Sequence, residues 1–104
     1  MSSDKNEKKE IINIVYSNKG FALIYDEDVD NSLDNNLDST SLNILSPNLP
    51  SGTPVRITNI INGKSLMTIV KKKTVLPVFF NSVITKRIVS ELSINPKEPY
   101  VYIE

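Results

Sequence analysis

The sequence contains no cysteine and no histidine among its 104 residues. Without cysteine the chain has no disulfide and no thiolate nucleophile, and the absence of both residue types excludes the tetrahedral zinc sites built from them. Without histidine it also lacks the one side chain whose unperturbed pKa lies near neutral pH, on which much acid–base catalysis depends. The lack of cysteine does not locate the protein, because a domain of this size can be stable without disulfides.

Long apolar runs are also missing. No stretch approaches the ~20 apolar residues that a membrane-spanning helix needs. Residues 1–10, MSSDKNEKKE, lack the apolar core of a signal peptide, so any export signal is expected outside this sequence. Because these residues would bury almost no apolar surface, we expect a disordered tail over 1–10 and one folded domain over 11–104.

The net charge is zero, but the charges are unevenly distributed along the chain. Residues 1–40 hold nine acids and four bases, a net charge of −5, whereas residues 41–104 hold three acids and eight bases, a net charge of +5. Such a dipole can attract an anionic partner to the second half, or the two halves can attract each other within the fold, which is the favoured interpretation. A nucleic-acid site is not expected, because the chain is neutral overall and only Phe79 and Phe80 accompany the basic segment.

Short apolar and β-branched runs separated by turn residues predict a mainly β domain. We expect strands at residues 11–16, 21–25, 55–60, 65–70 and 100–103, and a further strand that begins at residue 78. Residues 41–45 are a short apolar segment before Pro47 and Pro50, which interrupt regular hydrogen bonding. One short amphipathic helix is expected over residues 84–92, with Thr85 or Ser82 as its N-cap. About six strands with one helix indicate a small β-barrel or α+β domain.

The connections carry their own signals. Residues 17–20 have turn composition, and residues 26–41 form a long acidic stretch whose Asp, Asn and Ser residues disfavour a helix and predict a loop. Asn62-Gly63 predicts a hairpin with the two positive φ angles of a type I′ turn. The return arm at 65–70 is apolar enough to predict burial on both faces.

The hairpin residues resemble a known family. Residues 49–59, LPSGTPVRITN, followed by NGKS at 62–65, closely resemble the pattern LPxGTxVxVTNxxNGxSV of rare lipoprotein A (RlpA-like) domains. Residues 20–25, GFALIY, resemble the opening GxASWYG strand of that family, with Ile24 in place of its tryptophan. The likeness extends over about residues 20–104. It implies a six-stranded double-psi β-barrel with pseudo-twofold crossed loops, as in bacterial envelope lytic transglycosylases and, more distantly, plant expansins.

Two catalytic positions of the family carry different residues here. Ser46 stands where the active enzymes have histidine, and Lys72 stands where they have aspartate. A second aspartate of the family aligns near Val83. The glutamate that the family has in the acidic loop aligns with Asn35 or Asp38. Glycan cleavage needs a carboxyl group and stabilisation of developing positive charge, and a lysine with an unperturbed pKa of about 10.4 supplies neither.

The resemblance therefore implies a pseudoenzyme of the periplasm or cell envelope. We expect it to be a monomer that binds peptidoglycan glycan strands or an envelope protein, with no cofactor, no metal and no catalytic residue. The predicted ligand-binding residues are Tyr25, Ser46, Asn48, Lys71, Lys72 and Lys73. Tyr25 would stack on a sugar ring or, as an alternative, cover the barrel. The lysines would contact anions such as peptide carboxylates or phospholipid headgroups, or form a solvated loop, which is the favoured interpretation.

Other functions remain open at this point. An active transglycosylase could use acids of the loop between Asp26 and Asp38, if one of their pKa values were raised. A structural or protein-interaction domain would present an exposed edge or an apolar patch. The alternating oxygens of the acidic loop resemble the start of a calcium loop, but Asn31 replaces its glycine and Leu37 its glutamate, which argues against a calcium site.

Overall fold

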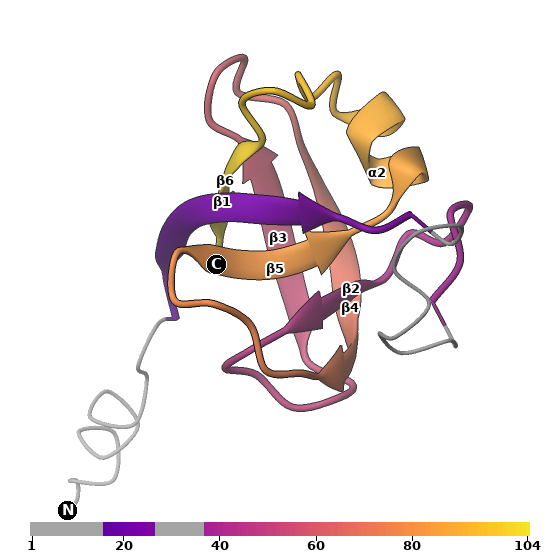
Figure 1. Cartoon of the computed structure of the whole chain (residues 1–104), viewed down its shortest axis with the longest axis vertical. Coiled ribbons are helices and arrows are strands. Elements are labelled where there is room, and N and C mark those ends of the chain that lie inside the picture. Colours follow the sequence, from indigo (N-terminus) through magenta and orange to yellow (C-terminus); the bar gives the residue numbers. More distant parts are fainter. Residues whose placement is uncertain (1–15, 27–36) are drawn as a thin grey trace, which may run out of the picture.

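The chain folds into a closed six-stranded β-barrel with one short helix (Figure 1). The structure is a computed structural model that describes residues 16–26 and 37–104. The predicted tail at 1–10, most of the predicted strand at 11–16 and the centre of the acidic loop lie outside these residues. The elements are β1 (Asn18–Ile24), β2 (Ile44–Ser46), β3 (Pro54–Asn59), β4 (Ser65–Lys73), β5 (Phe80–Ile84), α2 (Lys86–Glu91) and β6 (Tyr100–Ile103).

The sheet is mixed. Around the barrel the strand order is β1-β5-β2-β4-β3-β6. The β1/β5 and β2/β4 pairs are parallel, and the four other pairs are antiparallel. This pattern is unchanged when β1, β2 and β3 are exchanged with β4, β5 and β6, so the pairing has a pseudo-twofold symmetry. Figure 1 shows β1 and β5 side by side and running in the same direction. Closure leaves no strand edge open to pairing with another chain.

Alternation of side chains builds the core. In β3, Val55, Ile57 and Asn59 point inward, while Arg56 points to solvent, as the period of two in the sequence predicts. The buried hydrophobic residues of the main cluster include Ala22, Ile44, Val55, Ile57, Val70, Ile84, Ile88, Val101 and Ile103. Each fully buried aliphatic side chain of this kind contributes roughly 1.5–3 kcal/mol to the free energy of unfolding. The mainly β barrel with one helix is thus confirmed.

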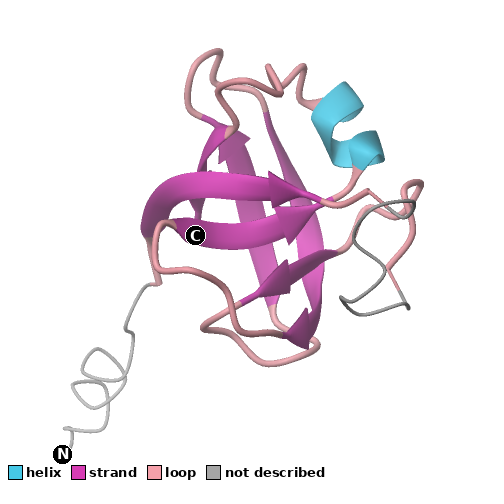
Figure 2. Ribbon diagram, in the orientation of Figure 1, coloured by secondary structure: helices cyan, strands magenta, loops and turns pink. Residues whose placement is uncertain are grey.

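The helix follows β5 and lies at one end of the barrel (Figure 2). Thr85 is its N-cap, because the Thr85 hydroxyl oxygen accepts a hydrogen bond from the Ile88 amide at 3.2 Å. The other candidate cap, Ser82, lies inside β5 and is buried. Ile88 and Leu92 turn toward the core, which confirms the predicted apolar face.

The hairpin between β3 and β4 forms at the predicted place, but the type I′ prediction is wrong. Asn62 does not adopt a positive φ, and within this loop only Gly63 does, at 80°. The Asn59 amide donates to the Lys64 carbonyl, and the Gly63 amide donates to the Asn59 carbonyl, so residues 60–63 form the loop. Longer hairpin loops of this kind are built around a right-handed turn and need one left-handed residue, which glycine supplies.

The two motif asparagines hold this loop against the end of α2. Nδ2 of Asn59 and Nδ2 of Asn62 each donate to the Leu92 carbonyl at 3.0 Å. The Asn59 side-chain oxygen also accepts from the Ile61 amide at 3.1 Å. Because the last carbonyls of a helix have no partner within it, these amides satisfy one of them. The asparagines of the ITN and NG segments therefore have a structural role in the barrel.

Several boundaries differ from the sequence prediction. The helix predicted over 84–92 spans Lys86–Glu91, because Ile84 belongs to β5. β1 begins at Asn18 because residues 18–21 pair with β6, so residues 17–20 do not form a turn. β5 begins at Phe80, so Val78 and Phe79 lie in the preceding loop. β4 extends to Lys73 through its pairing with β2.

Burial on both faces of the return arm is also wrong. Thr68 and Val70 are buried, whereas Met67 and Ile69 face outward and are exposed. A closed barrel has a single interior, so each of its strands can bury only alternate side chains within it.

Candidate functional site

The parallel pairing of β2 and β4 gathers most of the predicted site residues at one end of the barrel. The register places Leu45 beside Lys72 and Ser46 beside Lys73. Both strands end there, at the lower end in Figure 1, and the loops 47–53 and 74–79 begin there. Residues that lie 26 apart in the sequence, Ser46 and Lys72, are thereby brought into neighbouring positions. We call this region, with Ser46, Asn48 and Lys71–Lys73, the lysine end of the barrel.

The Ser46 side chain is buried and hydrogen-bonded to backbone amides. The residue as a whole is only 2% exposed. The hydroxyl oxygen accepts hydrogen bonds from the Asn48 amide at 3.1 Å and the Leu49 amide at 3.0 Å. The Thr74 amide donates to the Ser46 carbonyl at 2.9 Å, which ties loop 74–79 to β2. A serine needs an adjacent base to act as a nucleophile, and the chain has no histidine to provide one. The hydroxyl therefore fixes the turn after β2.

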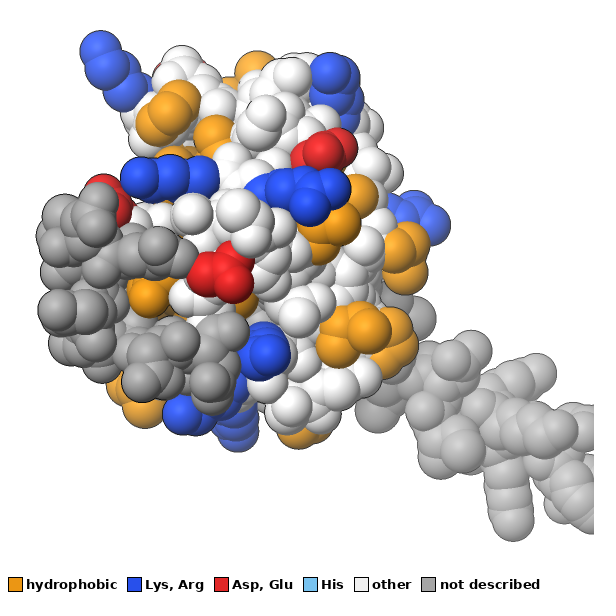
Figure 3. Space-filling view, turned by 90° about the vertical axis from the view of Figure 1, so that its right-hand side faces the viewer, with side chains coloured by type: hydrophobic (Ala, Val, Ile, Leu, Met, Phe, Trp, Pro, Cys, Tyr) orange, Lys and Arg blue, Asp and Glu red, His pale blue; other side chains and the backbone are white. Residues whose placement is uncertain are grey.

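The three lysines are exposed along the end of β4. Thr68 and Val70 point inward and Met67 and Ile69 point outward. The β2/β4 register shifts between the Ile44–Val70 and Leu45–Lys72 pairs, so this alternation does not continue regularly through the lysines. In the described part of the chain, the ion pairs are Arg56–Glu104, Lys86–Asp26 and Arg87–Glu91, and none involves these lysines. Figure 3 views the molecule from the right-hand side of Figure 1 and shows basic side chains beside hydrophobic ones along its lower edge.

Asp38 is the acid whose charge acts on Lys71. Hydrogen bonds from the Thr40 hydroxyl at 2.6 Å and the Thr40 amide at 2.9 Å to Oδ1 lower the pKa of Asp38, and the charge of Lys71 lowers it further. The carboxylate is therefore ionised at neutral pH. A general acid for glycan cleavage needs the opposite shift, so Asp38 does not fit that role.

Tyr25 lies apart from a groove. It is 3% exposed and packs in a small cluster with Leu37, Leu45 and Val83. Its ring face is thus covered by protein, and the observed arrangement is the packing alternative rather than an open stacking platform for sugar. Val83, which stands near a second catalytic position of the family, belongs to the same buried cluster.

Asn48 borders a pocket of about 330 Å³ at the lysine end. Its lining combines the polar side chains of two asparagines with apolar residues of loops 47–53 and 74–79 and of β5: Asn18, Pro47, Asn48, Leu76, Pro77, Val78 and Phe80. Beside the pocket, Nδ2 of Asn18 and Nδ2 of Asn48 both donate to the Tyr16 hydroxyl oxygen, at 3.2 Å and 3.1 Å. Since both contacts use the oxygen as acceptor, the phenol proton is left to bind a ligand acceptor.

Sequence reasoning missed this pocket because its lining comes from three separate segments. The sequence predicts a strand end at Tyr16, a turn at Asn18 and the start of a strand at Val78. The one local signal was the unalternating apolar run around Pro77, which is atypical of a half-buried strand.

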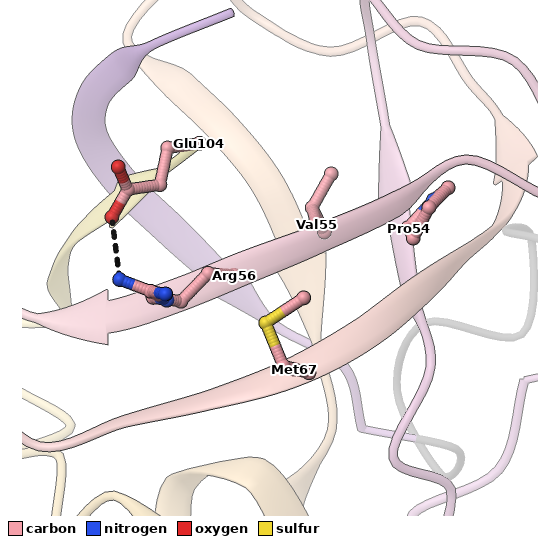
Figure 4. Close-up of a pocket in the computed structure, with 5 residues that line it drawn as sticks. All are labelled: Pro54, Val55, Arg56, Met67 and Glu104. Carbon is pink, nitrogen blue, oxygen red and sulfur yellow. Dashed lines mark ion pairs between the residues drawn. The ribbon is translucent and has the colours of Figure 1, made fainter.

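A second hollow lies on the barrel wall (Figure 4). It has a volume of about 240 Å³ and is lined by Pro54, Val55, Arg56, Met67 and Glu104. Arg56 and Met67 are cross-strand partners, and the Arg56 guanidinium pairs with the Glu104 carboxylate at 3.7 Å. The charged groups of this hollow therefore already satisfy each other, and it contains no predicted site residue.

Residues 16–26 and 37–104 contain neither a candidate metal site nor a helix that could span a membrane. No group of three or more Asp or Glu residues close enough to hold a metal ion occurs there. The acids at 28, 30 and 34 of the calcium-like pattern lie outside that part of the chain. No helix in the described residues is long and apolar enough to cross a membrane.

The comparisons with known proteins give no assignment. The chain matches no model of a known protein family and no curated protein sequence. The likeness to RlpA-like domains therefore stays a prediction from residues 20–104, to be weighed with the barrel and the lysine end.

Proposed function

We propose that this protein is a non-catalytic RlpA-like double-psi β-barrel of the cell envelope that binds peptidoglycan through the lysine end. The observation that carries the proposal is the identity of the two side chains that share this end. Ser46 and Lys72 stand at the positions that the resemblance aligns with a catalytic histidine and aspartate, and the β2/β4 register brings them together. A pair of catalytic positions is expected to meet in space, so their proximity supports the alignment.

The topology supports the double-psi assignment. A six-stranded barrel with pseudo-twofold crossed connections is what the resemblance implies. The pairing pattern here has that symmetry, with one parallel pair in each equivalent position. Since a fold alone does not determine function, the proposal depends further on the chemistry of the lysine end.

That chemistry favours binding over cleavage. Lytic cleavage requires a carboxyl that exchanges a proton and a site that tolerates positive charge at the anomeric carbon. Ser46 is buried and hydrogen-bonded to the backbone, and Lys72 would repel the developing cation. Asp38 has a lowered pKa and is ionised, which disfavours the alternative of an active transglycosylase that uses this carboxyl.

The same groups suit a carboxylated glycan polymer. Peptidoglycan carries carboxylates on its stem peptides and hydroxyls on its sugars. Lys71–Lys73 can bind the carboxylates, and the Tyr16 hydroxyl beside Asn48 can donate to a sugar oxygen. Each exposed ion pair is worth about 0–1 kcal/mol, so binding of one repeat is weak. A polymer that presents many repeats raises the apparent affinity.

The experiment is sedimentation with purified peptidoglycan sacculi, with protein measured in the pellet and muropeptides in the supernatant. The wild-type protein is expected in the pellet, with no anhydro-muropeptides released. The double variant Lys72→Glu/Lys73→Glu should remain in the supernatant. The control Lys64→Glu/Lys97→Glu makes the same charge change at exposed residues outside the lysine end and should still pellet. If the wild-type protein stayed in the supernatant, peptidoglycan binding would be rejected.

A further inference from the structure

The loop that follows the lysines exposes apolar side chains almost completely. Val75 is 94% exposed, Val78 is 99% exposed and Phe79 is 59% exposed. Single exposed hydrophobic residues are common on protein surfaces. Three of them within five positions of one loop are a different case, and the core of the barrel does not account for them.

The ends of this loop are fixed to the barrel. At its start the Thr74 amide donates to the Ser46 carbonyl of β2 at 2.9 Å, and at its end the Phe21 amide of β1 donates to the Phe79 carbonyl at 3.2 Å. The rings of Phe79 and Phe80 contact each other with centroids 4.7 Å apart. Pro77 also restricts the backbone within the loop. The apolar side chains are thus presented outward by an anchored loop.

The charges beside the loop indicate what it meets. Lys71–Lys73 immediately precede it on β4, and they make no ion pair with another described residue. A protruding apolar tip flanked by exposed cations is the arrangement that attaches a protein to an anionic bilayer surface. A protein partner would call for a contiguous apolar patch or groove of matching shape. Val75 lies outside the pocket that Val78 borders, and asparagines line part of that pocket.

We propose that loop 74–79 inserts Val75, Val78 and Phe79 into the headgroup region of an anionic lipid bilayer, while Lys71–Lys73 contact the lipid phosphates. This inference goes beyond peptidoglycan binding and does not require it. Each lysine near an anionic surface raises binding by about fivefold. The two ligands use the same lysines, so soluble peptidoglycan fragments and vesicles compete for the protein.

The first test is co-sedimentation of the full chain with vesicles. The protein should bind to vesicles of phosphatidylglycerol and phosphatidylcholine. Its affinity for vesicles of phosphatidylcholine alone should be lower by about tenfold or more. Val75→Asp removes an inserted apolar group and adds a negative charge, so it should weaken binding by about tenfold or more. Ile61→Asp is the matched control, because Ile61 is an exposed apolar residue of the β3–β4 loop, and it should bind like the wild-type protein.

The second test measures insertion directly. The chain has no cysteine, so Val75→Cys carries a polarity-sensitive fluorophore at one site. Its emission should shift to the blue on anionic vesicles, whereas the same label at Ile61→Cys should not shift. Thermal melts of each variant by circular dichroism establish that it is folded.

The outcomes separate this inference from the proposed function. Val75→Asp should still pellet with sacculi, while Lys72→Glu/Lys73→Glu should lose both ligands. Vesicle binding without sacculus binding would reject the proposed function and leave the membrane inference standing. Absence of vesicle binding would overturn the inference. The inference would also be overturned if the wild-type protein and Val75→Asp bound equally well to anionic vesicles and equally well to polyglutamate. The lysines alone would then explain the attraction.

Discussion

At the scale of single residues, the barrel uses buried asparagines to join its parts. The Asn59 side chain donates to the Leu92 and Ser93 carbonyls at 3.0 Å and 3.3 Å and accepts from the Ile61 amide. Asn81 is likewise buried and donates to the Asn18 and Val101 carbonyls at 3.0 Å and 3.1 Å. A buried polar group that loses its partner costs free energy, so these side chains restrict the number of ways in which the barrel can pack.

Replacement of Asn59 tests this role. Asn59→Ala should lower the free energy of unfolding by about 1–3 kcal/mol, because the Ser93 carbonyl loses the donor and the Ile61 amide loses the acceptor that Asn59 provides. Asn62→Ala should cost less, since Asn62 is exposed and water can replace it. Urea unfolding of both variants measures the difference. Equal losses would show that the burial of Asn59 is not what matters.

The lowered pKa of Asp38 predicts how the stability of the protein depends on pH. This pKa lies below the ordinary value of 3.8 because Thr40 donates to the carboxylate. A carboxyl whose pKa is lowered by folding adds stability above its unfolded pKa, and this stability is lost as the pH falls through the folded pKa. Thr40→Ala should therefore raise the pKa of Asp38 and destabilise the protein at neutral pH, with the difference shrinking below about pH 4.

Carboxyl chemical shifts followed by NMR through the acid range measure this pKa. Replacing Asp38 with asparagine provides the control, because Thr40→Ala should have a smaller pH-dependent effect in that background. An unchanged Asp38 pKa in Thr40→Ala would contradict the assigned cause.

At the scale of elements, the stability of α2 depends on its N-cap residue, Thr85. The Thr85 hydroxyl accepts from the Ile88 amide at 3.2 Å and donates to the Ser41 carbonyl. Thr85→Ala should therefore lower the free energy of unfolding by about 0.5–2 kcal/mol. Ser90→Ala, at an exposed position of the same helix, should change it by less than about 0.5 kcal/mol. Denaturant unfolding compares the two, and a larger loss in Ser90→Ala would refute the capping role.

Local patterns predicted the elements better than their ends. Alternation identified β3 and β6, and the threonine cap identified the start of α2, since these signals depend on near neighbours. The hairpin loop is held by contacts of Asn59 and Asn62 with Leu92, which lies 33 and 30 residues away. Such long-range contacts leave no local signal, and the same holds for the β4 extension paired with β2.

At the scale of the whole molecule, the barrel brings the two halves of the chain into mutual contact. Each parallel pair joins a strand of the first three to one of the last three. An ion pair between Asp26 and Lys86 at 3.7 Å also links the acidic half to the basic half. The sequence pattern predicted a small β-barrel or an α+β domain with one helix, and the resemblance implied a six-stranded barrel, which is confirmed. The position of loop 74–79 was missed, because Val78 and Phe79 were read as strand residues.

Closure also decides which predicted site residues can act together. The lysine end unites Ser46, Asn48 and Lys71–Lys73 because β2 and β4 are parallel neighbours. Tyr25 belongs to a buried cluster instead. Ser46 and Lys72, which the resemblance aligns with two catalytic positions, lie close together in the fold, but the alignment alone gave no information on their burial.

The most direct measurement is mass spectrometry of the material released when the wild-type protein is incubated with intact sacculi. A lysine where cleavage needs a carboxylate predicts that the protein associates with the pellet and that the supernatant contains no anhydro-muropeptides above the level of a protein-free sample. Anhydro-muropeptides that accumulate with time and with protein concentration would contradict the claim that this barrel binds without cutting.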